Sequence, residues 1–201
     1  QLGDEARESL DLLQNRVARM HSLIEGVLQY SRVGRIKEDL VEIDLNALLP
    51  GIIDAIAPPE HVHIRVEGSL PVIECEKTRV IQVFQNLLTN AVKYMDKAVG
   101  RIVVACTEGD DAWTFSVRDN GPGIEEKYFD RIFKIFQTLA PRDEFESTGV
   151  GLTLVKKIVE YYGGRIWLTS EIGEGTTFFF RLPMSKAQAA ETMAQTAESA
   201  C

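Results

Sequence analysis

Three short blocks dominate the interpretation of this sequence: QNLLTNAVKY (residues 85–94), DNGPGI (residues 119–124) and TGVGL (residues 148–152). The first block supplies two amides and a lysine, the second a carboxylate beside glycines, and the third two glycines where a helix is expected to begin. Amide oxygens are suitable ligands for Mg²⁺, and the free N–H groups at the start of a helix favour phosphate. Together the blocks predict a pocket for a nucleotide and its metal ion.

The first block forms one face of a predicted helix over residues 76–94. At about 100° per residue, Asn86, Asn90 and Lys93 fall in one narrow arc, with Tyr94 at its edge. The opposite side is apolar and consists of Val80, Ile81, Phe84, Leu88 and Ala91. A polar helix face is by itself more often solvated surface than a binding site. The two later blocks favour the binding site.

In the second block, Asp119 ends a predicted strand and can accept a hydrogen bond from the exocyclic amine of a purine. Gly121 and Gly123 let the backbone approach a ligand without a Cβ in the way. Alone, such a segment is more often a plain β-turn. Gly149 and Gly151 open a helix, where N–H groups and the helix dipole favour phosphate. The three blocks in this order are a specific pattern, and they predict an ATP site.

Composition narrows the class of protein. The chain has 201 residues, is 45% hydrophobic and carries a net charge of -8, which suits one medium domain with an appendage. No basic patch is present, so we expect no nucleic-acid partner. Cys75, Cys106 and Cys201 show no metal-ligand spacing and favour a reducing, cytoplasmic location. No apolar run could cross a bilayer, so no direct membrane contact is expected, and the start at Gln1 suggests part of a longer protein.

Residues 4–35 are predicted to form one long helix. Its apolar residues alternate at spacings of three and four, a heptad seam made of Leu10, Leu13, Val17, Met20, Ile24 and Val27. Further apolar residues widen this face beyond that of a two-stranded coil, which indicates a helical bundle. We expect residues 1–38 to form a bundle helix, residues 39–184 an α+β domain, and residues 185–201 a flexible tail.

The α+β domain is expected to be a two-layer sandwich, a mostly antiparallel sheet covered by helices. Asp44 can cap a helix over residues 45–57, which Pro50 should kink or restart. Other predicted helices span residues 125–136 and 151–162. Strands are predicted over residues 41–45, 62–66, 101–107, 113–118, 165–170 and 176–182. The sequence contains neither the GxxxxGK[ST] pattern of a P-loop nor an early GxGxxG pattern of a Rossmann fold. Neither of these two nucleotide-binding folds is therefore expected.

The motifs resemble the catalytic ATP-binding domain of sensor histidine kinases, a Bergerat-type fold in the superfamily that includes DNA gyrase, the heat-shock chaperone ATPase and MutL-type proteins. QNLLTNAVKY is similar to the N box of this family, DNGPGI to its first glycine box, FDRIFKIF to its F box and GVGL to its second glycine box. The likeness covers residues 41–183. RMHSLIEGVLQYSRVGR resembles the second helix of the dimerisation and phosphotransfer domain of phytochrome-like kinases.

The resemblance implies ATP and Mg²⁺ as ligands and a role for each matching residue. Asn90 would bind Mg²⁺, with Lys93 and Asn86 beside the phosphates as catalytic residues. Tyr94 would flank the adenine, and Asp119 would bind its amine. Other nucleotide contacts implied by the boxes are Gly121, Gly123, Ile124, Phe136, Thr148, Gly149, Val150, Gly151 and Leu152. Residues 137–148 would form a lid, in which Arg142 is the cation placed to reach a phosphate.

Two departures from the family pattern matter. Thr153 stands where many relatives carry a further glycine. The histidine that accepts phosphate in the family lies in an H-[ED]-x-[RK]-x-P pattern, which these 201 residues do not contain. His21 lacks the neighbours of that pattern, so it is interpreted as a bundle histidine. The chain is therefore expected to be a histidine kinase that does not phosphorylate itself.

Three functions are compatible with these residues. The first is a histidine kinase that works on the phosphotransfer helix of its own homodimer and relays phosphate to a response regulator receiver domain. The second is a non-catalytic, nucleotide-responsive adaptor that binds a kinase or a response regulator. The third is a hydrolytic ATPase or an anti-sigma-type serine kinase. Asn86 argues against the third, because hydrolytic relatives carry a glutamate there and an amide cannot take a proton from water. The intact pocket motifs argue against the second.

Overall fold

A five-stranded sheet forms one layer of the fold in the computed structural model, which describes residues 4–138 and 148–184. The strand order is β2-β4-β5-β7-β6. β2 is parallel to β4, and the other neighbours are antiparallel. The bounds are β2 Val62–Glu67, β4 Gly100–Glu108, β5 Ala112–Asp119, β6 Arg165–Glu171 and β7 Gly175–Pro183. The expected α+β sandwich with a mostly antiparallel sheet is confirmed.

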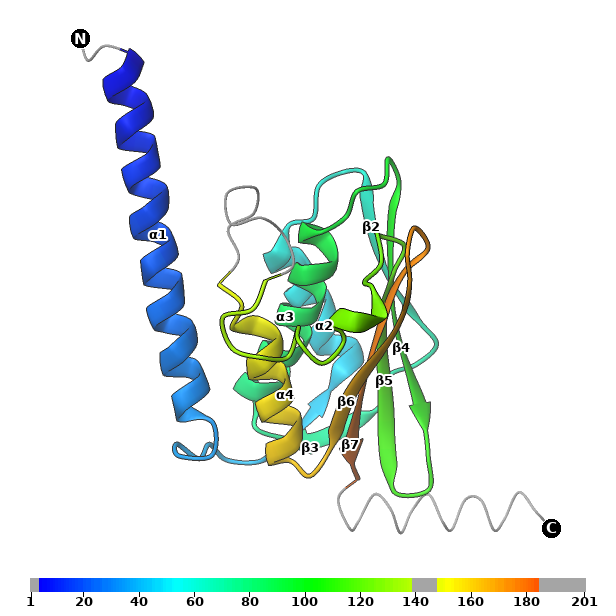
Figure 1. Cartoon of the computed structure of the whole chain (residues 1–201). Coiled ribbons are helices and arrows are strands. Elements are labelled where there is room, and N and C mark those ends of the chain that lie inside the picture. The colour runs from blue at the N-terminus through cyan, green and yellow to red at the C-terminus, as the bar shows by residue number, and fades with distance from the viewer. Residues whose placement is uncertain (1–3, 139–147, 185–201) are drawn as a thin grey trace, which may run out of the picture.

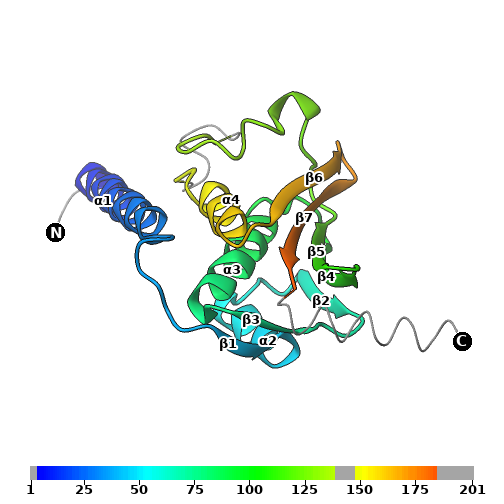
Figure 2. The same cartoon turned by 90° about the horizontal axis from the view of Figure 1, so that it is seen from below.

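The second layer consists of α2 (Leu45–Ile56), α3 (Lys77–Lys93) and α4 (Gly151–Tyr161), which cover one face of the sheet (Figures 1 and 2). α3 packs between α2 and α4. Phe84 of α3 meets Phe115 and Phe180 of the sheet edge to face, with ring centroids 5.8 and 5.4 Å away. The apolar side of α3 predicted from its periodicity is therefore the side that faces the core.

A smaller sheet lies beside α2, where β1 (Val41–Asp44) pairs with β3 (Val72–Cys75) in antiparallel register. β3 was not predicted from the sequence, because its pairing with the distant β1 defines it rather than a local pattern. Asp44 caps α2 as predicted, accepting a hydrogen bond from the backbone N–H of Asn46 at 2.9 Å. α2 continues through Pro50, so the restart expected at the proline does not occur. Leu45, Leu49 and Ile52 bury its apolar stripe on both sides of that position.

The helix predicted over residues 125–136 is wrong. The chain forms a short 3₁₀ helix, η1 (Glu126–Tyr128), and then a series of turns. Tertiary contacts explain the difference: the backbone carbonyl of Phe133 accepts a hydrogen bond from Thr153 Oγ1 at 3.1 Å, and its ring meets that of Phe178 edge to face. Such contacts outweigh a weak local preference for helix. They also give Thr153, the departure from the family glycine, a structural role.

The long helix α1 (Asp4–Arg32) is confirmed, with Gly34 in the left-handed region at φ +78° just beyond its end. Its C-terminal half lies beside α4, and its N-terminal half projects past the rest of the fold (Figure 1). Six seam residues, Leu10, Leu13, Val17, Met20, Ile24 and Val27, are all exposed. Within the described residues, no helix has the length and apolar character needed to cross a bilayer.

Candidate functional site

α3 brings the side chains of the first block to one side of the site. Asn86, Asn90, Lys93 and Tyr94 are all partly buried, whereas Leu87 and Leu88 between them point into the core. The Asn86 amide nitrogen donates to the carbonyl of Gln82 at 2.7 Å, which orients the side chain. The amide oxygen of Asn86 is then left to accept a hydrogen bond or to bind a metal ion. Lys93 Nζ lies 5.8 Å from the centre of the Tyr94 ring, within cation–π range.

Asp119 lies at the last residue of β5 and is held by backbone donors. Its Oδ1 accepts from the N–H of Gly121 at 2.8 Å and from the N–H of Thr176 at 3.3 Å. Burial raises the pKa of the Asp119 carboxyl above its ordinary value, although these hydrogen bonds act in the opposite direction. A Cβ on Gly121 would lie 2.9 Å from the same oxygen. Gly121 thus allows the carboxylate to be held in place.

The third block places the start of α4 against α3. A Cβ on Gly151 would lie 2.6 Å from Asn86 Oδ1, so only a glycine permits this approach. Gly149 has φ +66°, and a Cβ there would lie 2.7 Å from the backbone N of Gln137. The N-cap residue Val150 has no side chain that could accept from the first N–H groups of the helix. These N–H groups and the helix dipole form a favourable site for an anion.

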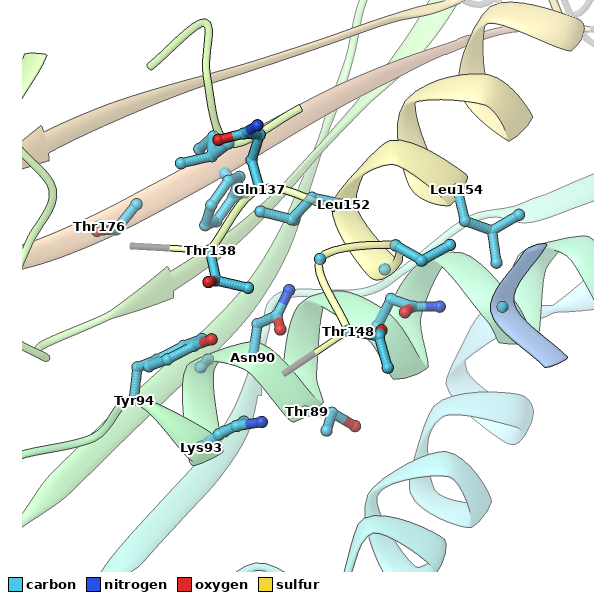
Figure 3. A pocket seen from close by; sticks show the side chains of 18 of the residues that line it. Thr89, Asn90, Lys93, Tyr94, Gln137, Thr138, Thr148, Leu152, Leu154 and Thr176 are labelled. Carbon is cyan, nitrogen blue, oxygen red and sulfur yellow. The ribbon is translucent and has the colours of Figure 1, made fainter. Parts of the chain in front are cut away.

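The three blocks meet in one pocket of about 520 Å³. Figure 3 shows Asn90, Lys93 and Tyr94 on one side, Thr148 and Leu152 at the loop that begins α4, and Thr176 on the sheet side. Twelve of the predicted site residues line it: Asn86, Asn90, Lys93, Tyr94, Asp119, Gly123, Ile124, Thr148, Gly149, Val150, Gly151 and Leu152. This volume lies in the range typical of small-molecule sites.

Two predicted site residues do not line this pocket. Gly121 is buried beneath Asp119 and acts through that carboxylate. Phe136 is 55% exposed, and its backbone N–H donates to the carbonyl of Gly149 at 2.9 Å. Its backbone, in the left-handed region at φ +63°, therefore supports the glycine loop. The lid residues 139–147, with Arg142, lie outside the described residues.

Several residues that line the pocket were not predicted from the sequence. Thr176 donates its backbone N–H to Asp119, and Phe178 follows it on β7. Their place after the turn at Gly173 and Gly175 carried no sign of a pocket. Four further lining residues come from α1, namely Ser22, Glu25, Gly26 and Gln29. They recur at helical spacing, but only the position of α1 beside α4 brings them to the site.

The residues present fit a magnesium nucleotide. Asn90 offers a hard amide oxygen of the kind that Mg²⁺ accepts, and the N–H groups at the start of α4 suit phosphate oxygens. Gly151 leaves open the space that a Cβ would fill beside Asn86. Among the described lining residues, Lys93 is the one lysine or arginine. Asp119, a partly buried acceptor at the sheet side, suits an amine of the base.

Comparison with known proteins identifies the family of the chain. The family model described as histidine kinase-, DNA gyrase B-, and HSP90-like ATPase matches residues 75–186, more than half of the chain. Cyanobacterial phytochrome B of Nostoc sp. is 41% identical over 181 residues, which are 88% of this chain and 24% of that protein. The phytochrome-like protein Cph1 of Synechocystis sp. is 36% identical over 185 residues, which are 91% of this chain and 25% of that protein.

A crystal structure of full-length ShkA in complex with AMPPNP matches with a TM-score of 0.73 and 27% identity, covering 92% of this chain and 40% of ShkA. The chain spans about a quarter of the length of the two phytochromes. Because these matches cover 88%, 91% and 92% of this chain, the similarity extends into α1 as well as over the α+β domain.

Proposed function

Because this chain belongs to the family of histidine kinase-, DNA gyrase B- and HSP90-like ATPases, we propose that it is the ATP-binding, catalytic portion of a two-component sensor histidine kinase. One observation carries the proposal. Three motifs far apart in the sequence converge on a single pocket, with a carboxylate at one end and an open helix start at the other. Such a pocket suits a ligand that has an amine at one end and phosphates at the other.

Each residue has a defined role in this proposal. Asp119 accepts from the adenine amine, and Tyr94 packs against the base. The N–H groups of residues 149–152 hold the phosphates, and Lys93 offsets part of their charge. Asn90 is the ligand for Mg²⁺, which, when bound, neutralises phosphate charge as the terminal group is transferred.

Phosphoryl transfer suits this pocket better than hydrolysis. Asn86 occupies the position one helical turn before Asn90, and an amide cannot accept a proton from an attacking water at neutral pH. A neutral imidazole needs no such base, because one of its nitrogens already carries a lone pair. That nitrogen attacks the γ-phosphorus, an N–P bond forms, and the bond to the β–γ bridging oxygen breaks to release ADP. The ring N–H proton is lost to solvent.

We place the acceptor histidine outside this chain, on the helix that pairs with α1. His21 is exposed and does not line the pocket. Residues 1–38 would be the second helix of the dimerisation and phosphotransfer domain, residues 39–184 the catalytic domain and residues 185–201 a tail. The partners of the whole protein would be a second kinase subunit and the receiver domain of a response regulator.

Incubation with γ-labelled ATP and Mg²⁺ tests the proposal. The chain alone should acquire no acid-labile, alkali-stable phosphate, and a peptide that carries the upstream acceptor helix should become labelled. ATP binding without transfer to that peptide would favour the adaptor function instead. Label on the isolated chain that is lost in His21→Gln would show that His21 is the acceptor.

A further inference from the structure

α1 presents two opposite faces. Ser22, Glu25, Gly26 and Gln29, spaced i, i+3, i+4 and i+7, form one stripe, the pocket stripe, and line the nucleotide pocket. The seam residues lie on the other side of the helix, where Met20, Ile24 and Val27 are 56%, 59% and 38% exposed. The helix can therefore use its seam in a bundle while its pocket stripe stays against the catalytic domain.

Specific contacts hold the pocket stripe in place. A Cβ on Gly26 would lie 3.1 Å from Val150 Cβ, so the backbone of α1 packs directly on Val150, which is only 2% exposed. One turn further along, Lys157 of α4 donates to the carbonyl of Tyr30 at 2.7 Å, and its Nζ lies 3.9 Å from the centre of the Tyr30 ring. At the end of α1, Arg79 donates to the carbonyl of Arg32 at 3.3 Å.

The pocket stripe lies at one defined end of the pocket. Gly26 packs on Val150, and the next residue, Gly151, packs on Asn86. α1 therefore borders the start of α4, where the N–H groups suited to phosphate are found. In Figure 3 the α1 segment, drawn in blue, lies near Leu154 at the opposite end of the view from Tyr94 and Thr176. α1 therefore lies at the end of the pocket that suits phosphate rather than at the end that suits the base.

We propose that the pocket stripe of α1 is a fourth wall of the nucleotide site and that Glu25 discriminates between ATP and ADP. This inference rests on the proposed function. The γ-phosphate adds negative charge at the end of the pocket where Glu25 supplies a carboxylate, and like charges repel. Glu25 is exposed, so solvent screens the repulsion, and we expect it to change affinity by about two- to fivefold.

The consequence is a link between the nucleotide and the position of α1. ADP fits the pocket with α1 docked, whereas ATP binds more favourably when α1 has moved away. By thermodynamic reciprocity, ATP weakens the docking of α1 to the same extent that docking weakens ATP. The exchange of ADP for ATP would therefore release the helix that carries the bundle seam.

Calorimetric titration with Mg-ADP and with a Mg-bound non-hydrolysable ATP analogue tests this inference. Glu25→Gln should tighten the analogue by about two- to fivefold and change ADP much less. Gly26→Leu should displace α1 from Val150 and have the same effect on the ratio of the two affinities. In the Gly26→Leu background, Glu25→Gln should then have no further effect. Gly51→Leu is the control, because Gly51 is also a glycine within a helix, but it is exposed and nothing lies within 4 Å of its Cβ position.

The outcomes separate this inference from the proposed function. Binding of both nucleotides with an unchanged ratio in Glu25→Gln would overturn the role of α1 and leave the ATP site intact. A weaker analogue in Glu25→Gln would also overturn it, because Glu25 would then be attracting the metal rather than repelling phosphate. If the unmodified chain bound neither nucleotide, the proposed function would fail, and this inference with it.

Discussion

At the scale of single residues, Asp119 is a partly buried carboxylate whose position is set by its neighbours. Two backbone N–H groups and the absence of a Cβ on Gly121 keep its carboxylate at the end of β5. Burial nevertheless raises the pKa of this carboxyl, so its ionised form is less favourable in the folded protein than in water. This cost in stability supports the proposed role of Asp119 in binding the base.

Asp119→Asn should therefore separate binding from stability. The new side chain presents a mixed donor and acceptor to the adenine amine, and ATP affinity should fall by about 1–3 kcal/mol. The ligand-free protein should be as stable as before or more stable, because the ionised carboxyl is removed. Calorimetric titration and thermal unfolding measure the two effects. Unchanged affinity in a folded variant would exclude Asp119 from the site.

The pH dependence of stability gives an independent check of Asp119. Its pKa is raised above 3.8 in the folded state, so below that value both states are protonated and Asp119 has no effect. As the pH rises through the folded-state pKa, the unfolded state is already ionised and stability is lost. The melting temperature of Asp119→Asn minus that of the unmodified protein should therefore increase as the pH is raised from about 4 to 7. A constant difference would contradict the raised pKa.

At the scale of elements, α3 packs on the core with one face and lines the pocket with the other. Its buried face packs on α2, α4 and the sheet, and its other face carries Asn86, Asn90 and Lys93 into the pocket. The position of the site therefore depends on the packing of one helix. Phe84, which is 1% exposed and contacts two aromatic rings of the sheet, is at the centre of that packing.

Truncating the Phe84 side chain should destabilise the whole domain. Phe84→Ala removes a fully buried ring and should lower the free energy of unfolding by about 3–5 kcal/mol. Gln85→Ala, at the next and exposed position of the same helix, should change it by less than about 0.5 kcal/mol. Urea unfolding of both variants measures the difference. Equal, small effects would show that α3 is not anchored through Phe84.

A buried ion pair at the start of α3 is hydrogen-bonded to the end of α1 and to the segment that follows it. Arg79 Nε donates to a Glu76 oxygen at 3.2 Å, and these side chains are only 4% and 3% exposed. The other Glu76 oxygen accepts from the backbone N–H of Glu38 at 3.3 Å. The pair thus ties the segment between α1 and β1 to the α+β domain.

Removing one partner of this pair should lower the free energy of unfolding more than replacing both partners does. Arg79→Met leaves Glu76 buried without its cation and should cost about 3–5 kcal/mol. The double variant Glu76→Gln with Arg79→Met carries no buried charge and should recover much of that loss. Chemical unfolding of the single and double variants provides the comparison. A double variant no more stable than Arg79→Met would mean that the pair acts mainly through its hydrogen bonds to the backbone.

At the scale of the whole molecule, α1 leaves an apolar seam on its outer side. Leu13, Val17, Met20 and Ile24 are each 56% to 60% exposed. Burial of such side chains is favourable by roughly 25 cal/mol per Å², so the seam is expected to pair with other helices. This arrangement agrees with a bundle helix, and the α+β domain contributes nothing to cover it within the described residues.

Substitutions that place charged side chains on the seam should prevent α1 from pairing with another helix. They should leave the nucleotide site intact. Val17→Glu with Ile24→Glu should abolish association with the acceptor helix, because two carboxylates would otherwise be buried in the bundle. Nucleotide affinity should not change, since the seam points away from the pocket. Gln14→Glu, an exposed site off the seam, is the control. Sedimentation and phosphoryl transfer to the acceptor peptide measure the pairing of α1 with the acceptor helix. If the double variant transferred phosphate as fast as the unmodified protein, the seam would not be the surface that pairs with the acceptor helix.

The sequence by itself determined the family, the helices α3 and α4, and most of the pocket lining. Each of these depends on local spacing: the two asparagines and the lysine share a helix face by periodicity, and the glycines mark where the backbone must turn or pass closely. A short block of sequence is enough to encode such features, so it could be predicted from the sequence that Asn90, Asp119 and Gly151 line one pocket.

Only the tertiary structure decided the features that depend on distant parts of the chain. β3 exists because it pairs with β1, and the segment after η1 is irregular because Thr153 and Phe178 hold Phe133. The place of α1 is the largest such case. Its stripe of Ser22, Glu25, Gly26 and Gln29 is visible in the sequence, but the path of the chain beyond Gly34 sets which face of the helix meets α4 and so lines the pocket.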